Sequence, residues 1–174
     1  MHQKFKTKLD QMDASLAEMI KVLDNLQADE LHHNPSDKWS PAQVFQHLHD
    51  SEKGTAAYLR KKLQSAPSEV PSGGVGSLIR SMLLKRALRS RKNHFRAPKI
   101  LSEVSEKPAY DELRQSYLET RTEIRDILSG VDSKQAGKAY FKHPRAGRLT
   151  IGQTLDFLED HFDRHFDQIK ERIK

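Results

Sequence analysis

The sequence TIGQTLDFLEDHFDRHFDQIKERI, from Thr150 to Ile173, decides the fold of this chain. Its apolar residues recur at spacings of three, four and seven, which is the pattern of one face of an α-helix. These residues are Ile151, Leu155, Leu158, Phe162, Ile169 and Ile173. The stretch therefore predicts a helix over 150–173 that packs one face against a core.

Two histidines lie on or beside this apolar stripe. His161 and His165 are four residues apart, so their imidazole rings project from the same face about one turn apart. Two rings placed in this way can bind one transition metal. The motif reads H-F-D-R-H, and Phe162 stands where metalloproteases of the H-E-x-x-H type carry a glutamate, which argues against peptide hydrolysis by that mechanism. Such a pair alone is more often structural, and a third ligand would favour the metal.

A second helix supplies a candidate third ligand. The sequence 40–43, Ser-Pro-Ala-Gln, is a capping box with proline at the first helical position, and it predicts a helix that runs to about Leu63. His47 falls on the buried face of this helix, whereas His49 is predicted to be solvated. The adjacent histidines 32 and 33 are predicted to be solvated loop residues.

The same periodicity predicts two more long helices. One covers 5–26, and the other begins near Pro108 and ends before Gly130. A shorter helix is predicted over 77–91, and no segment shows convincing strand alternation. We therefore predict an all-α fold, an up-down four-helix bundle with an extra short helix between helices two and three. The whole chain, 1–174, has the size of a single domain.

Composition restricts the chemistry of any site. The chain has no cysteine, so a metal must use nitrogen and oxygen ligands. The N-terminus lacks an apolar signal region and the longest apolar run is too short to span a bilayer, so we expect a cytoplasmic protein without a membrane partner. The net charge of +6 is uneven, because 70–102 contains eight Lys or Arg and no acid. A localised basic patch can bind nucleic acid.

The cores of helical bundles are where facing helices assemble metal sites. His47, His161 and His165 would supply three neutral nitrogens and leave positions for water or a substrate, as in catalytic zinc sites. Zinc, nickel, copper and iron all suit three imidazoles. Because histidine must be neutral to bind, and its usual pKa is about 6.5, we expect binding to weaken below about pH 6.

These residues also invite a comparison with a known family. The sequence 39–48, WSPAQVFQHL, resembles the second-helix signature of the DinB-like family, which includes YfiT-type proteins. The later run from His143-Pro144 through H-F-D-R-H to Gln168-Ile169 resembles the fourth helix of that family and its approach. The resemblance covers most of the chain. It implies a four-helix bundle with one divalent transition metal, zinc or nickel, on the three histidines, and relatives include thiol S-transferases and a maleylpyruvate isomerase.

Two functions are compatible with the sequence. The first is a metal-dependent thiol S-transferase or hydrolase that acts on a small molecule, possible partners being low-molecular-weight thiols. His143 is a weak catalytic candidate for it, since a loop-fixing hydrogen bond before Pro144 is an alternative role. The second is a non-enzymatic binding protein, associated with stress or nucleic acid, that uses the basic segment 80–99 and keeps a structural metal. A homodimer is the candidate assembly, although the sequence does not give the oligomeric state.

Overall fold

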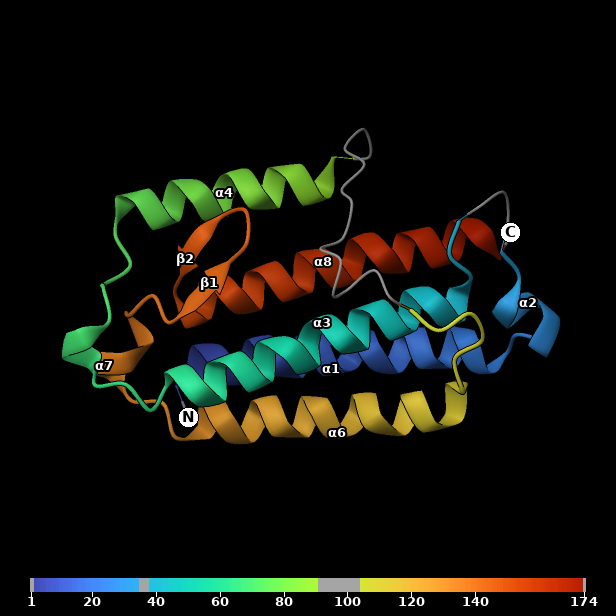
Figure 1. Cartoon of the computed structure of the whole chain (residues 1–174), viewed down its shortest axis with the longest axis horizontal. Helices are drawn as coiled ribbons and strands as arrows, with labels where there is room; N and C mark the ends of the chain where they lie inside the picture. Colours follow the sequence, from blue (N-terminus) through green and yellow to red (C-terminus); the bar gives the residue numbers. More distant parts are fainter. Residues whose placement is uncertain (1, 35–37, 91–103, 174) are drawn as a thin grey trace.

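The computed structural model describes residues 2–34, 38–90 and 104–173, and four long helices form the all-α bundle that the sequence predicts (Figure 1). These helices are α1 (Gln3–Asp24), α3 (Pro41–Lys62), α6 (Tyr110–Ser129) and α8 (Ile151–Arg172). Each boundary lies within two residues of the predicted one. Helix α3 packs against α6 and α8, and α1 packs against the same two helices.

The helix directions explain the long connection in the middle of the chain. In Figure 1, α1 and α8 run from left to right, and α3 and α6 run in the opposite direction. The direction therefore alternates between α1 and α3 and between α6 and α8, but not between α3 and α6. Helix α4 (Val75–Arg89) carries the chain back along the bundle, so that α6 begins at the same end as α3.

Both capping boxes form at the helices that carry the candidate histidines. The hydroxyl of Ser40 accepts a hydrogen bond from the amide of Gln43 at 3.2 Å, and Gln43 Oε1 accepts from the amide of Ser40 at 3.0 Å. Thr150 and Gln153 make the same reciprocal pair, at 3.3 and 2.9 Å. These bonds satisfy amide groups that a helix start leaves without partners, and they fix where α3 and α8 begin.

Several short elements were not predicted. They are α2 (Ala28–His32), the 3₁₀ turn η1 (Pro67–Glu69), α7 (Ser133–Ala136), β1 (Phe141–His143) and β2 (Gly147–Leu149). The two strands pair antiparallel, with Phe141 opposite Leu149. These strands show no alternation in the sequence, because a strand of three residues is too short for an alternating pattern. Gly147 closes the hairpin with a φ of 69°, a conformation that glycine adopts without strain.

The apolar core forms two clusters, and α8 contributes to both. Leu155 and Leu158 pack in one cluster with residues of α1, α6 and the hairpin. Phe162, Phe166 and Ile169 pack in the other, beside α2 and the first turns of α3. The pair His161 and His165 therefore begins where the first cluster gives way to the second.

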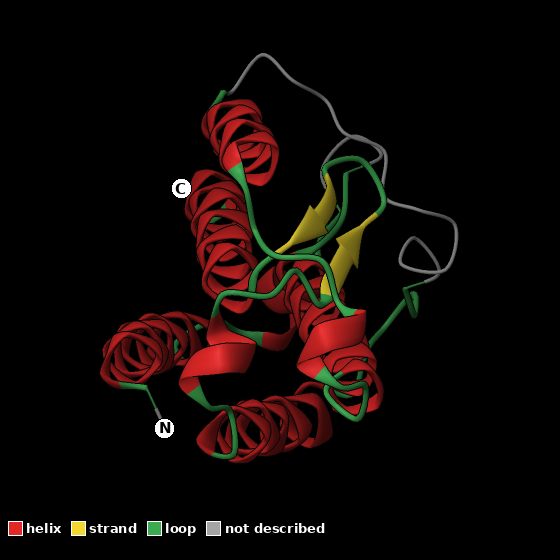
Figure 2. Ribbon diagram, turned by 90° about the vertical axis from the view of Figure 1, so that its left-hand side faces the viewer, coloured by secondary structure: helices red, strands yellow, loops and turns green. Residues whose placement is uncertain are grey.

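Helix α4 lies outside the bundle and packs mainly on α8, as the view along the helices shows (Figure 2). The side of α4 that faces the bundle buries few residues, namely Ser77 and Leu88. The exposed side of α4 is more apolar. We define the outer face as Val75, Leu78, Ile79, Met82 and Leu83, which are 73, 57, 53, 70 and 61% exposed, and Leu78 and Met82 at its edge also border a cleft toward α8. None of the described helices is long and apolar enough to cross a membrane.

Candidate metal centre

The structure brings together the three histidines that the sequence singled out. His47 comes from α3, and His161 and His165 come from α8. The ring centroids of His47 lie 5.2 and 4.9 Å from those of His161 and His165, which are 4.6 Å from each other. His47 Nε2 and His161 Nε2 are 3.3 Å apart. One ring nitrogen of each histidine lies within 4.8 Å of the other two, so the three could hold one metal ion.

Neighbouring side chains orient the rings. The Nδ1 of His165 lies 2.8 Å from Gln168 Oε1, one turn further along α8. Because this amide oxygen can only accept, Nδ1 carries the proton and Nε2 keeps a free lone pair for a metal. The ring of Trp39, which precedes the capping box, packs on His47 with centroids 5.0 Å apart. The possible metal ligands are therefore three imidazoles, two of which are oriented by neighbouring side chains. Three imidazole nitrogens suit zinc or nickel.

The surroundings keep His161 and His165 neutral. Burial lowers the pKa of His161 well below its usual value, and the charges of His165 and His47 lower it further. Burial, and then the charge of His47, lowers the pKa of His165 to about 3. Neutral imidazole is the form that binds a metal, so the site is prepared for an ion at physiological pH.

The ring of Phe157 lies between His143 and the three histidines of the cluster. Its ring meets Phe157 edge-on at 4.6 Å, and Phe157 stacks on His161 at 5.6 Å. The Nδ1 of His143 accepts hydrogen bonds from the amides of Arg145 at 3.2 Å and Ala146 at 3.0 Å. These are loop-fixing hydrogen bonds of the kind that the sequence suggested as the alternative role. Because Nδ1 accepts, the neutral ring carries its proton on Nε2 and can donate from there.

Burial, and to a lesser extent the charge of Arg145, lowers the pKa of His143 to about 4. The ring is therefore neutral at pH 7, with its one free nitrogen acting as a donor. This geometry favours a hydrogen-bond donor over a general base. A catalytic part for His143 stays a prediction.

The other histidines depart from their predicted positions. His49 was predicted to be solvated, which is wrong, because α6 covers it and leaves it 4% exposed. Its ring nitrogens lie 2.9 Å from Asp50 Oδ1 and 3.0 Å from Ser116 Oγ. His32 ends the short helix α2 instead of lying in a loop, and it is partly buried, whereas His33 is exposed. None of the three joins the metal cluster.

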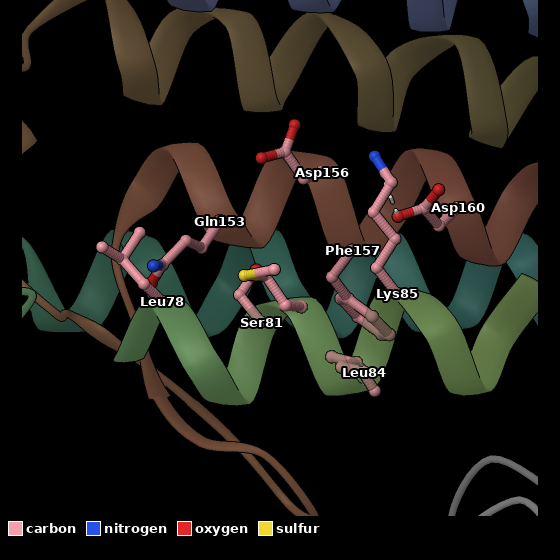
Figure 3. A pocket seen from close by; sticks show the side chains of 9 residues that line it. Leu78, Ser81, Leu84, Lys85, Gln153, Asp156, Phe157 and Asp160 are labelled. Carbon is pink, nitrogen blue, oxygen red and sulfur yellow. Dashed lines mark ion pairs between the residues drawn. The ribbon is translucent and has the colours of Figure 1, made fainter. Parts of the chain in front are cut away.

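The described part of the basic segment, residues 80–90, forms ion pairs and hydrogen bonds with α8 next to the histidines. Arg89 Nε lies 3.0 Å from Asp160 Oδ1. Lys85 Nζ lies 3.9 Å from Asp160 Oδ2 (Figure 3). Arg164 donates to the carbonyl oxygens of Leu88 and Ser90 at 2.7 and 2.9 Å, which caps the end of α4. Residues 91–99 lie outside the described part. Nucleic-acid binding stays a prediction that these contacts do not favour, because two of the cations already meet a buried carboxylate.

A cleft of about 210 Å³ opens between α4 and α8 (Figure 3). Leu78 and Leu84 line it from α4, and Phe157 and Asp160 line it from α8. Phe157 also stacks on His161, so this cleft shares one wall with the histidine cluster.

A buried ionic network between α3 and α6 escaped the sequence analysis. Glu52, Tyr117 and Arg121 are 1, 0 and 4% exposed. Glu52 Oε1 accepts from the Tyr117 hydroxyl at 2.6 Å and from Arg121 Nη2 at 2.8 Å, and Arg121 Nε donates to the other carboxylate oxygen. Both Glu52 and Arg121 are types that usually mark a solvated face, so periodicity alone gives no signal for this pair.

The chain is thus a helical bundle in which three histidines could hold a metal ion, and the comparisons identify its family. The sequence profile of the DinB superfamily matches residues 11–169, and the chain belongs to this superfamily. It is similar to the uncharacterized protein YuaE of Bacillus subtilis, with 26% identity over 154 residues that cover 86% of each chain. No solved structure matches the chain.

Proposed function

We propose that this protein binds one divalent transition metal, zinc or nickel, on His47, His161 and His165, and that it is a metal-dependent thiol S-transferase or hydrolase for a small molecule. The convergence of three ring nitrogens within 4.8 Å carries this proposal. When bound, such a metal supplies a Lewis acid that activates a thiol or a water near neutral pH.

The residues around the cluster would position the reactants. Gln168 holds the ring of His165, and Trp39 packs on His47, so the open side of the cluster keeps a fixed shape. His143 would act through its Nε2–H as a neutral donor to an oxygen of the substrate. The cytoplasm is the proposed location, because low-molecular-weight thiols are abundant and reduced there.

The first experiment is elemental analysis of protein purified without a metal-affinity tag, followed by a screen for conjugation of small thiols. We expect close to one zinc or nickel per chain in the wild type, much less in His47→Ala, and thiol conjugation or hydrolysis that follows the metal content. A wild type as free of metal as His47→Ala would reject the metal centre. Full metal content with no activity in the screen would favour the structural-metal alternative.

That alternative, a nucleic-acid-associated protein, has its own measurement. Binding through the basic segment should weaken steeply with salt, because phosphate contacts release counterions. Replacing Arg86, an exposed basic residue of α4 that does not pair with Asp160, should flatten the salt slope. Absence of binding to single- and double-stranded DNA and RNA at low salt would remove this alternative.

A further inference from the structure

The face of α8 that carries the metal ligands continues toward the C-terminus. His161, His165, Gln168 and Arg172 follow one another at spacings of four, three and four residues. At 100° per residue these four side chains fall within an arc of about 60°, one above the other. Gln168 already contacts His165, so Arg172 is the next residue outward from the metal centre.

Arg172 is a partly buried cation without a partner for its inner nitrogen. Its Nη1 is shielded from solvent and has no hydrogen-bond partner. Burial lowers the pKa of Arg172, with the charge of Glu171 acting in the opposite direction. A shielded guanidinium nitrogen without an acceptor destabilises a fold unless something else requires it.

The position of Arg172 couples it to the metal centre. The Cα atoms of His165 and Arg172 are about 10 Å apart along the helix axis, and long side chains on a helix lean toward its N-terminus. The guanidinium therefore leans back toward Gln168 and His165. Burial is the main cause of the lowered pKa of His165, and the charge of His47 comes next. The charge of Arg172 makes a smaller contribution, so the two groups lie within electrostatic reach of each other.

Trp39, the aromatic neighbour of His47, lies at the same end of the bundle as Arg172. Ile173, the residue after Arg172, packs in the same apolar cluster as Trp39. Trp39 in turn packs on His47 at 5.0 Å. A small molecule bound at the histidines and extending along α8 would therefore have Trp39 on one side and the guanidinium at its far end.

We propose that Arg172 is the anion-binding residue of this centre and that its substrate is a small molecule with a carboxylate a few bonds from the reacting group. This inference rests on the proposed function. A guanidinium pairs with a carboxylate through two parallel hydrogen bonds. A single guanidinium neutralises one negative charge, which fits a carboxylate better than a doubly charged phosphate monoester.

The test uses cobalt-substituted protein, in which a bound thiolate gives a charge-transfer absorption. The probes are straight-chain mercaptocarboxylic acids, from mercaptoacetate upward, and the matching neutral amides. We expect the wild type to bind the best acid about 10- to 100-fold more tightly than its amide, the range of a charge-assisted hydrogen-bonded pair. Arg172→Gln should abolish this preference and leave the cobalt content and the affinity for the amide unchanged.

Two variants provide controls. Lys170→Gln removes another cation of α8, which lies over the ring of Phe166 at 3.8 Å and pairs with Glu18 at 3.6 Å, and it should keep the preference. Arg172→Met keeps the aliphatic bulk and removes the charge, so it should raise the melting temperature of the probe-free protein. A purely structural arginine would give a lower melting temperature. Equal binding of acid and amide by the wild type, a preference that survives in Arg172→Gln, or destabilisation by Arg172→Met would each overturn the proposal.

The outcome also separates this inference from the proposed function. If the wild type takes up no cobalt, the metal centre is rejected, and the preference is then measured in the metal-free protein. Trp39 is the single tryptophan of the chain and lies against His47, so its fluorescence reports binding of the same acids and amides. A preference for the acids that disappears in Arg172→Gln supports the anion site on its own, and no preference overturns it.

Discussion

The buried histidines make the stability of the metal-free protein depend on pH. In the folded chain, burial lowers the pKa of His161 well below its usual value and that of His165 to about 3. In the unfolded chain both pKa values return to about 6.5. Between about pH 6.5 and pH 3 the unfolded state therefore binds protons that the folded state does not. The free energy of unfolding is at its full value above this range and falls as the pH falls through it.

The magnitude follows from the pKa of His165. At pH 5 the unfolded-state pKa of a histidine lies about 1.5 units above the pH, whereas the folded-state pKa of His165, about 3, lies below it. His165 alone therefore lowers the free energy of unfolding by about 2 kcal/mol relative to pH 7.5, and His161 acts in the same direction. For a chain of this size, about 2 kcal/mol corresponds to a melting temperature roughly 4–8 °C lower.

Thermal melts of chelator-treated protein at pH 7.5 and pH 5 measure this effect. The double variant His161→Gln/His165→Gln should lose most of the decrease, whereas His33→Gln, which removes an exposed histidine, should keep it. Equal melting temperatures at the two pH values in the wild type, or an unchanged decrease in the double variant, would refute the reasoning.

The low folded-state pKa values also revise an expectation from the sequence. With ordinary histidines, metal binding should weaken below about pH 6. With the pKa of His165 at about 3, protons do not compete for this ligand in the folded site at pH 5. At several hundred times its Kd, a metal should add on the order of 3–4 kcal/mol at both pH values. The difference in melting temperature between metal-loaded and chelated protein should therefore persist at pH 5.

Three further predictions concern single side chains. His47→Ala should lose the metal, whereas His49→Ala should keep it but melt at a lower temperature because His49 is buried and hydrogen-bonded; elemental analysis and melts of the two proteins compare them. Glu52→Gln should lower the free energy of unfolding by about 3–5 kcal/mol, measured by urea titration, because it leaves the buried Arg121 without its main partner. The outer face of α4 exposes on the order of 500 Å² of apolar surface, near the apolar share of an ~800 Å² half-interface, so we predict a homodimer through this face. Met82→Glu should then give a monomer by light scattering, and a monomeric wild type would contradict this assembly.

Periodicity and capping were sufficient to predict the four long helices and the inward direction of the histidines. Both capping boxes place the start of a helix, and from that start the inward direction of His47 and of His161 follows from 3.6 residues per turn. The crossing of α3 and α8 cannot be obtained in this way. It was inferred from the need for a third ligand, and the 3.3 Å between the Nε2 atoms of His47 and His161 agrees with it.

The features that escaped prediction depend on contacts between segments far apart in the sequence. His49 lies on the side of α3 that reads as polar, and only the approach of α6 buries it. Glu52 and Arg121 are separated by 69 residues, and each reads as a surface charge until the other is placed against it. Helix α4 turns Ser77 and Leu88 toward the bundle and places Arg89 and Lys85 beside Asp160, an orientation that its apolar periodicity does not predict.

The carboxylates near the cluster bear on whether its metal is structural or reactive. A structural zinc site is closed by four protein ligands, whereas a catalytic site keeps a position open. Among the described residues, the metal cluster consists of three histidines and no acid. Asp160, which precedes His161, pairs with Arg89, and Glu52, five residues beyond His47, is hydrogen-bonded to Tyr117 and Arg121. Because ion pairs hold these acids away from the cluster, the described residues leave the metal a coordination position for a substrate.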